Sequence, residues 1–208
     1  EGIPVIPQPG TNRWSGVSLP WMAFGYGLSV TPLQTLTLYN AVANDGVMVK
    51  PIFVSEIKEW NKTIKKFDTQ VINPKICTQE TLDKVHAVLE NVVKKGTGSK
   101  LYSKDFSMAG KTGTAQVNYK DKSKLYYASS FVGYFPADEP KYSCIVVVHK
   151  PNVAAGYYGA DVAGPVFKRI AQKIFTDSPS TNHVKNIDAK VVSQEKNYSE
   201  YYKKVEKE

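Results

Sequence analysis

Apolar residues recur at helical spacing in a stretch near the middle of the chain. Leu82, Val85 and Leu89 stand three or four positions apart, the spacing that brings side chains to one face of a helix. Two lysines and then Gly96 close the stretch, and basic residues followed by glycine are typical of a helix C-terminus. The pattern predicts an amphipathic helix that ends near Gly96.

Two further helices are indicated by their first residues. Thr31, Pro32 and Gln34 supply an N-cap, a proline at the first helical position and the glutamine of a capping box. This start predicts a helix to about residue 43, where Asn-Asp-Gly stops it. Near the other end of the chain, Pro165 opens VFKRIAQKIF, so we expect a last helix over residues 165–175.

Three long segments in the second half of the chain have the spacing of a β-meander. Residues 106–117, 126–135 and 142–150 are separated by polar turns, and successive strands joined in this way usually pair as antiparallel neighbours. An antiparallel sheet with packed helices predicts the α+β fold class.

The other segments are shorter. Residues 47–54, 55–60 and 63–67 alternate as short strands, with a hairpin turn between the last two. Residues 1–24 and 151–164 are expected to be loops.

Length and composition are those of a globular protein. A chain of 208 residues with 42% apolar residues can bury a core of its own. We predict one domain over residues 1–175 and a polar extension over residues 176–208 that is a linker or partly ordered. Because no run of eighteen apolar residues occurs, we expect this chain to be soluble.

The chain is basic, with a formal net charge of +8. Only Arg13 and Arg169 are arginines among the 27 basic residues, whereas base readout in nucleic acids favours arginine. We therefore expect no nucleic-acid partner. A basic surface suits an anionic polymer or a membrane face equally well.

Metal and thiol chemistry is not indicated. Cys77 and Cys144 lie far apart and match no metal spacing, and the three histidines stand alone. Cys144 belongs to the apolar run YSCIVVVHK, which favours a buried thiol. We expect no metal site and no cofactor.

Candidate chemistry centres on Lys111-Thr112-Gly113-Thr114, which interrupts the first long strand. Because side chains alternate along a strand, Lys111 should point to one side and the two threonines to the other. Gly113 leaves bare backbone between them, where an extended ligand could lie. The hydroxyls can hydrogen-bond a terminal carboxylate, and the ammonium raises the local potential. Taken alone, the trimer fits an incidental bulge equally well.

The segments around this motif give it a context. They are RWSGVSLPWMAFGYGLSVTPLQ, VVKKGTGSKL before the motif strand, and YYGADVAGPVF before the last helix. With Lys-Thr-Gly, they resemble the transpeptidase domain of class B penicillin-binding proteins, the enzymes that cross-link peptidoglycan, and most closely its division-type members. The resemblance covers residues 12–175 and implies the C-terminal part of a penicillin-binding protein/β-lactamase-like transpeptidase fold.

The resemblance also implies roles for the motif. Lys111 would belong to the proton-transfer and electrostatic network around the nucleophile, and Thr112 and Thr114 would hold the carboxylate of a substrate or antibiotic. Gly113 completes the motif, and the Thr114 N–H would form half of an oxyanion hole.

Three tyrosines look like the aromatic wall of the cleft in division-type members. They are Tyr127, Tyr157 and Tyr158. The alternative is that each is an ordinary core or interface aromatic.

The family also needs two upstream motifs, Ser-x-x-Lys with the acylated serine and Ser-x-Asn. Matches occur at Ser55-Glu56-Ile57-Lys58, Ser193-Gln194-Glu195-Lys196 and Ser180-Thr181-Asn182. Composition alone predicts about as many. Ser55 lies in a predicted strand and Ser193 in the tail, so neither has the helix start that returns a lysine to the serine.

The implied function is that of a fragment of a peptidoglycan D,D-transpeptidase that acts through an acyl-serine and is a target of β-lactams. Its partners would be stem peptides, β-lactams and cell-wall synthesis or division proteins, and its parent would be membrane-anchored and extracytoplasmic. Lacking the nucleophile, the fragment is expected to be inactive. A non-catalytic peptide sensor or scaffold, or a basic polymer-binding module, remains an alternative.

Overall fold

The computed structural model describes residues 2–118, 121 and 123–177. Contacts divide the chain into two compact units, Glu1–Ala171 and Gln172–Glu208. The elements that carry the site belong to the first unit. The predicted domain boundary at residue 175 stays a prediction, because most of the predicted extension lies outside the described residues.

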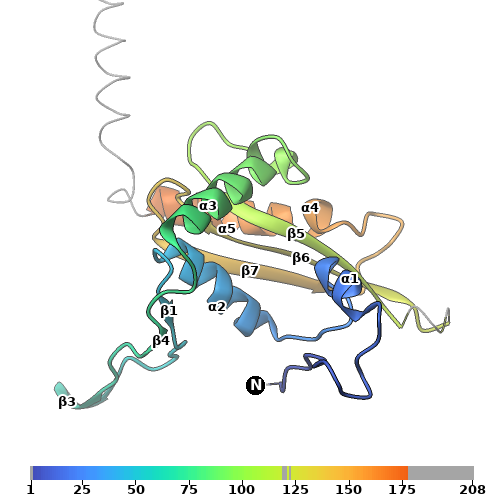
Figure 1. Ribbon diagram of the computed structural model, residues 1–208. Helices are drawn as coiled ribbons and strands as arrows, with labels where there is room; N and C mark the ends of the chain where they lie inside the picture. Colours follow the sequence, from blue (N-terminus) through green and yellow to red (C-terminus); the bar gives the residue numbers. More distant parts are fainter. Residues whose placement is uncertain (1, 119–120, 122, 178–208) are drawn as a thin grey trace, which may run out of the picture. The chain divides into compact units, whose positions relative to one another are not determined.

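A three-stranded antiparallel sheet forms the centre of the first unit (Figure 1). Its strands are β5 (Ala109–Val117), β6 (Tyr126–Phe135) and β7 (Tyr142–His149), in the order β5-β6-β7. The sheet predicted from the sequence is therefore confirmed, with β5 beginning three residues later than expected. Thr112 pairs with Phe131 and Thr114 with Ser129, so the motif lies in regular register on an outer strand of the sheet.

One face of the sheet is covered by α5 (Gly164–Asp177), the predicted last helix. Phe167 of α5 is fully buried, and its ring lies 4.7 Å from that of Phe131 and 5.7 Å from that of Phe135, centroid to centroid. These aromatic contacts attach the helix to the C-terminal half of β6.

The opposite face is covered by α2 (Pro32–Ala43) and α3 (Gln79–Lys94) (Figure 1). A buried cluster there joins both helices to β5 and β6; its members include Val42, Leu82, Leu89, Ala109 and Tyr134. Because side chains alternate along β6, Phe131 and Tyr134 face opposite layers. The central strand β6 is thus packed on both faces, whereas β5 and β7 are largely half-buried.

The helix signals of the sequence are confirmed in atomic detail. The Thr31 N–H donates to Gln34 Oε1 over 2.9 Å, and the Gln34 N–H donates to Thr31 Oγ1 over 3.1 Å, which completes the capping box of α2. Helix α3 ends at Lys94, next to Gly96 as predicted.

The segment between these helices differs from the prediction. Of residues 47–54, only β1 (Met48–Val49) is a strand, and it pairs with β4 (Val71–Asn73), which was not predicted. Pro51 has no N–H to donate, which explains why the strand ends early. The predicted hairpin is confirmed as β2 (Glu56–Glu59) and β3 (Lys62–Lys66), and its residues are all exposed.

Within the described part of the chain, three short helices were not predicted. The first, α1 (Ser18–Ala23), lies within residues 1–24, where we expected a loop. The second, η1 (Ser99–Leu101), follows α3, and the third, α4 (Gly159–Val162), lies within the predicted loop 151–164. Among the described residues, no helix combines the length and hydrophobicity needed to cross a bilayer.

Candidate functional site

The motif residues lie at the surface of β5. Lys111 is exposed, and Thr112, Gly113 and Thr114 are half-buried, so all four are accessible. Alternation alone would separate the lysine from the threonines. Instead, the long Lys111 side chain bends back, and its Nζ donates to the Thr112 carbonyl oxygen over 3.0 Å and to Thr112 Oγ1 over 3.2 Å.

The Thr112 hydroxyl has a partner that sequence reasoning did not identify. Thr97 Oγ1, between α3 and η1, lies 3.0 Å from Thr112 Oγ1. The next residue, Gly98, is buried, and a Cβ there would lie 3.5 Å from the Phe131 ring. Tight packing of this loop on the sheet therefore brings the two hydroxyls together. Thr97 falls within VVKKGTGSKL, the segment that carried part of the family resemblance.

The Thr114 hydroxyl is bound by a residue that follows the sheet in the sequence. The Gly159 N–H, at the start of α4, donates to Thr114 Oγ1 over 3.0 Å. Gly159 is buried and was also not identified from the sequence, although it lies in YYGADVAGPVF. The segment before the sheet thus contacts the Thr112 hydroxyl through Thr97, and the segment after the sheet contacts the Thr114 hydroxyl through Gly159.

Gly113 also has a close neighbour within the protein, on the adjacent strand β6. A Cβ at this position would lie 2.5 Å from Ser130 Oγ on the neighbouring strand, far inside contact distance. The sequence pattern alone predicts that a ligand approaches the bare backbone here. The Ser130 hydroxyl can rotate away from such a Cβ, so this contact favours glycine without requiring it, and the approach of a ligand stays a prediction.

The three predicted tyrosines lie together. The rings of Tyr127 and Tyr157 stack with centroids 4.2 Å apart, and Tyr157 lies 4.4 Å from Tyr158. The Tyr157 hydroxyl donates to the Tyr158 hydroxyl over 3.1 Å, and Gln116 Nε2 donates to the Tyr127 hydroxyl over 3.2 Å. Because Gln116 is two residues beyond Thr114 on β5, the aromatic cluster adjoins the motif.

Neighbouring phenols lower the acidity of Tyr157. The hydrogen bond to Tyr158, the charge that Tyr158 acquires at high pH and a smaller desolvation raise the pKa of Tyr157 to about 12. The Tyr157 phenol is therefore a neutral hydrogen-bonding group near pH 7, and it lies beside the Tyr127 and Tyr158 rings. They can present aromatic faces and hydroxyl groups to a ligand.

The structure supports the exclusion of Ser55 as a nucleophile. Ser55 lies beside β2, where its carbonyl oxygen accepts the Phe67 N–H over 2.9 Å. Lys58 pairs with Glu56 over 2.7 Å instead of returning to the serine. The other two matches, at residues 180–182 and 193–196, lie outside the described residues. Among residues 2–118, 121 and 123–177, no group of histidine, cysteine and acidic side chains could hold a metal ion.

The chain matches the family model described as penicillin binding protein transpeptidase domain over residues 7–172. It is 35% identical over 168 residues to the peptidoglycan D,D-transpeptidase FtsI of Buchnera aphidicola subsp. Baizongia pistaciae (strain Bp), a match covering 79% of this chain and 28% of that protein. The chain spans about a quarter of the length of the curated relatives it matches.

Solved structures show the same architecture. Penicillin-binding protein 2B from Streptococcus pneumoniae (strain R6) matches with a TM-score of 0.69 and 22% identity, covering 86% of this chain and 29% of that one. The transpeptidase domain of Burkholderia pseudomallei penicillin-binding protein 3 matches with a TM-score of 0.63 and 29% identity, covering 79% and 47% respectively.

Proposed function

Since this chain belongs to the transpeptidase domain family of class B penicillin-binding proteins, we propose that it forms the substrate-holding half of a peptidoglycan D,D-transpeptidase. The observation that carries the proposal is the arrangement on β5. One exposed ammonium, Lys111, and two half-buried hydroxyls, Thr112 and Thr114, lie within four consecutive residues of an outer strand. These are the donors that a peptide carboxylate requires.

An extended peptide can align with β5. Among the described residues β5 pairs with β6 alone, so its other edge could pair with a ligand strand through backbone donors and acceptors. The carboxylate would accept hydrogen bonds from the two threonine hydroxyls. The Thr114 N–H would stabilise the oxyanion that forms at the scissile carbonyl, and the tyrosine cluster would line the cleft beyond Gln116.

The chemical step needs a serine that this chain does not supply. In the proposed parent, the serine hydroxyl oxygen attacks the carbonyl carbon of the penultimate D-alanine of a stem peptide. The bond to the last D-alanine breaks, and its amine leaves with the serine proton. An amine of a neighbouring stem peptide then attacks the acyl-serine, forms the cross-link and regenerates the serine. β-Lactams acylate the same serine, and Lys111 takes part in the proton transfers.

The proposal also places the parent outside the cytoplasmic membrane, held there by an anchor, in contact with cell-wall synthesis or division proteins. The present chain would act only as part of that parent. Half of a groove offers hydrogen bonds worth about 0.5–1.5 kcal/mol each in water, which supports weak peptide binding and no acylation.

A fluorescent penicillin tests this function. The 208-residue chain should form no covalent adduct detectable by mass spectrometry, whereas a longer form that extends upstream through the serine motifs should be labelled. In the longer form, Lys111→Ala should slow labelling about a hundredfold. Lys62→Ala is the matched control, because Lys62 is an exposed lysine on β3 and should not affect labelling.

Two results would contradict the proposal. An acyl adduct on Ser55 or Ser193 of the short chain would show that a real nucleophile was rejected. A folded longer form that resists labelling would favour a non-catalytic peptide sensor with the same fold.

A further inference from the structure

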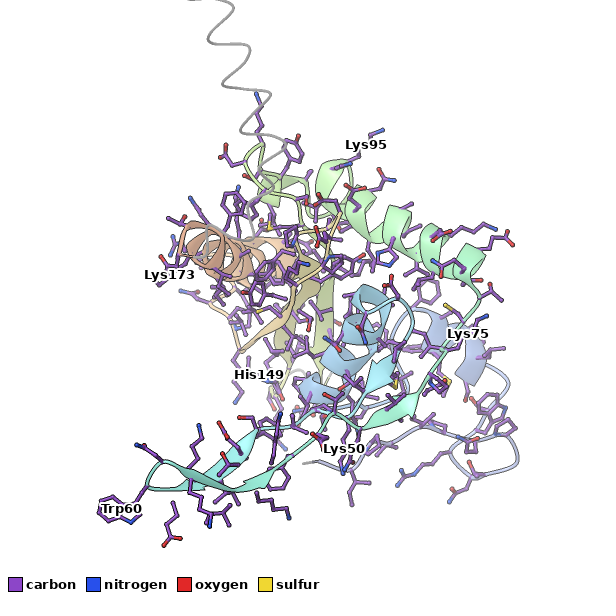
Figure 2. All side chains as sticks on the ribbon, turned by 90° about the vertical axis from the view of Figure 1, so that its left-hand side faces the viewer. Lys50, Trp60, Lys75, Lys95, His149 and Lys173 are labelled. Atoms are coloured by element: carbon purple, nitrogen blue, oxygen red, sulfur yellow. The ribbon has the colours of Figure 1, made fainter. Side chains whose placement is uncertain are left out.

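The segment between α2 and α3 presents many apolar side chains to solvent. Eight large ones, each at least 46% exposed, are Ile52, Phe53, Val54, Ile57, Trp60, Ile64, Val71 and Ile72. We call residues 50–72 the arm, and Figure 2 shows Trp60 at its far end. Exposed apolar residues scattered singly are ordinary, but a set gathered on one projecting segment marks an interaction surface.

The hairpin in this arm is a sheet of only two strands. All residues of β2 and β3 are exposed, and no other helix or strand of the described chain packs extensively on them. Three strands, or a covering helix, are normally needed to make such a ribbon stable in water. Among the described residues β3 pairs with β2 alone, so its outer edge offers unpaired backbone groups to another strand.

The hairpin turn carries a costly residue. Trp60 has a φ of 53°, in the left-handed region that glycine enters freely and a bulky residue enters only with strain. Its side chain is almost fully exposed, so no burial within the described chain offsets that strain. Tryptophan is also among the residues that most often anchor protein interfaces. The side chain is therefore suited to a contact outside this chain.

The charge on β3 selects the kind of contact. Three of its five residues are lysines, and none is acidic. Lys65 faces Ile57 across the hairpin, and Lys62 faces Glu59. Because Ile57 and Glu59 are two positions apart on β2, both lysines lie on the same side of the ribbon as Ile57. Glu59 shares that side but belongs to β2, one strand further from the outer edge of β3.

The opposite side of the hairpin already has polar contacts of its own. The Thr63 hydroxyl donates to Glu56 Oε2 over 3.0 Å, and Lys58 pairs with the same carboxylate over 2.7 Å. The side that holds Ile57 is thus the one left with ammonium groups and apolar surface for a partner.

Three occupants fit this surface unequally. A second copy of the chain that paired through its own β3 would set lysines against lysines, which repel. A bilayer touched by the tip would cover Trp60 and leave the apolar residues nearer the base, such as Phe53, in water. A strand with acidic and apolar residues, lying along β3, matches both the charge and the length of the exposed surface.

We propose that the outer edge of β3 is a docking site for an acidic, extended segment of a partner protein, which adds to the hairpin as a third strand. Lys62 and Lys65 pair with its carboxylates, and Trp60 packs on its apolar side chains. This docking site uses no residue of the β5 motif, so it stands independently of the proposed function.

The test uses a synthetic peptide in which glutamate and valine alternate, titrated into the 208-residue chain and followed by the amide NMR shifts of residues 62–66. We expect saturable binding. A matched peptide with lysine in place of glutamate should bind at least about tenfold more weakly, because attraction becomes repulsion. A glutamate peptide with N-methylated valines keeps its charge but loses backbone donors, and it should also bind at least about tenfold more weakly.

Variants of the chain locate the site. Trp60→Gly should weaken binding of the glutamate peptide about tenfold or more, whereas Trp60→Phe, which keeps an aromatic anchor, should stay within about threefold of the wild type. Lys65→Glu should reduce the preference for the glutamate peptide at least about threefold. Lys95→Glu is the matched control, because it changes the net charge equally at an exposed position that lies far from Trp60 in Figure 2.

Several results overturn the docking site. They are a glutamate peptide that does not bind, or that binds no better than the lysine or N-methylated peptide, and a Trp60→Gly variant that binds like the wild type. Trp60-dependent binding to phosphatidylglycerol vesicles without peptide binding assigns the arm to a membrane instead. Trp60-dependent dimers without peptide binding assign it to a second copy. None of these results alters penicillin labelling of the longer form, so the two proposals fail separately.

Discussion

The β5–β6 pair and the β2–β3 pair use the same antiparallel hydrogen bonds in opposite surroundings. Helices cover both faces of β6, and Phe131 and Tyr134 on that strand are fully buried. Every residue of β2 and β3 is exposed, and Trp60 at the turn is 95% exposed (Figure 2). Figure 2 shows Trp60 at the far end of the hairpin, away from the sheet.

The difference shows what makes a strand a suitable base for a site. Backbone pairing alone leaves a two-stranded ribbon marginal in water, because little apolar area is removed from solvent. The hairpin relies on local polar contacts such as the Thr63 hydroxyl to Glu56 over 3.0 Å. The motif instead lies on a strand whose neighbour is held by packing from two layers, which fixes its hydroxyls in place.

The largest test of this comparison is Phe167→Ala. Removing a fully buried ring that contacts Phe131 and Phe135 should lower the free energy of unfolding by about 3–5 kcal/mol. Urea unfolding followed by circular dichroism measures it. A loss below about 1 kcal/mol would show that aromatic packing of α5 does not hold the sheet.

Tyr134→Phe should have the next largest effect. The Tyr134 hydroxyl and His86 Nδ1 lie 2.6 Å apart, and burial raises the pKa of Tyr134, so the phenol stays neutral. Its removal leaves a partly buried ring nitrogen without its partner, which should cost about 1–3 kcal/mol in urea unfolding. Tyr142→Phe, at a 39% exposed position, is the control and should change stability little.

A pH titration tests the aromatic cluster at the rim of the sheet. The pKa of Tyr157 is raised to about 12 from an ordinary value near 10, mainly by its hydrogen bond to Tyr158. The contribution of this raised pKa to the free energy of unfolding is therefore present below about pH 10, and it is lost as the pH rises toward 12. In ¹³C NMR of labelled tyrosine rings, Tyr158→Phe should return Tyr157 toward its ordinary pKa. An unchanged Tyr157 titration would refute the role of the hydroxyl pair.

The smallest effect is expected at the hairpin tip. Trp60 has a φ of 53°, a conformation that favours glycine, and its side chain contributes no burial. Trp60→Gly should therefore change the free energy of unfolding by no more than about 0.5 kcal/mol. A loss above about 2 kcal/mol in the same urea experiment would mean that the hairpin is integral to the core, and the contrast drawn above would fail.

Local signals explain which elements could be predicted. The capping box of α2 and the alternating pattern of the three long strands are signals between residues close together in the sequence, so they can be recognised from the sequence alone. Helix α4 is only four residues long, and a three-dimensional contact, Gly159 to Thr114, holds its start. No periodic pattern in residues 151–164 carries that information.

The candidate site divides in the same way. Lys111, Thr112, Gly113 and Thr114 could be singled out because they are contiguous and interrupt a strand. Thr97 and Gly159 could not be assigned roles from chemistry, since they lie 15 and 45 positions from the hydroxyls they contact. Both residues do lie in segments that resemble the family. That resemblance singles out a segment, but it does not identify the residue that contacts the motif.

The contact between α2 and β7 has a consequence for how the chain is made. Asn40 Nδ2 donates to Ser143 Oγ over 3.1 Å, across 103 positions of sequence. At a synthesis rate of about 5–20 residues per second, α2 leaves the ribosome about 5–20 seconds before the strand that covers it. During that interval α3, β5 and β6 emerge and can cover the part of α2 around Val42, so the side of α2 that contacts β7 is the last to find its partner.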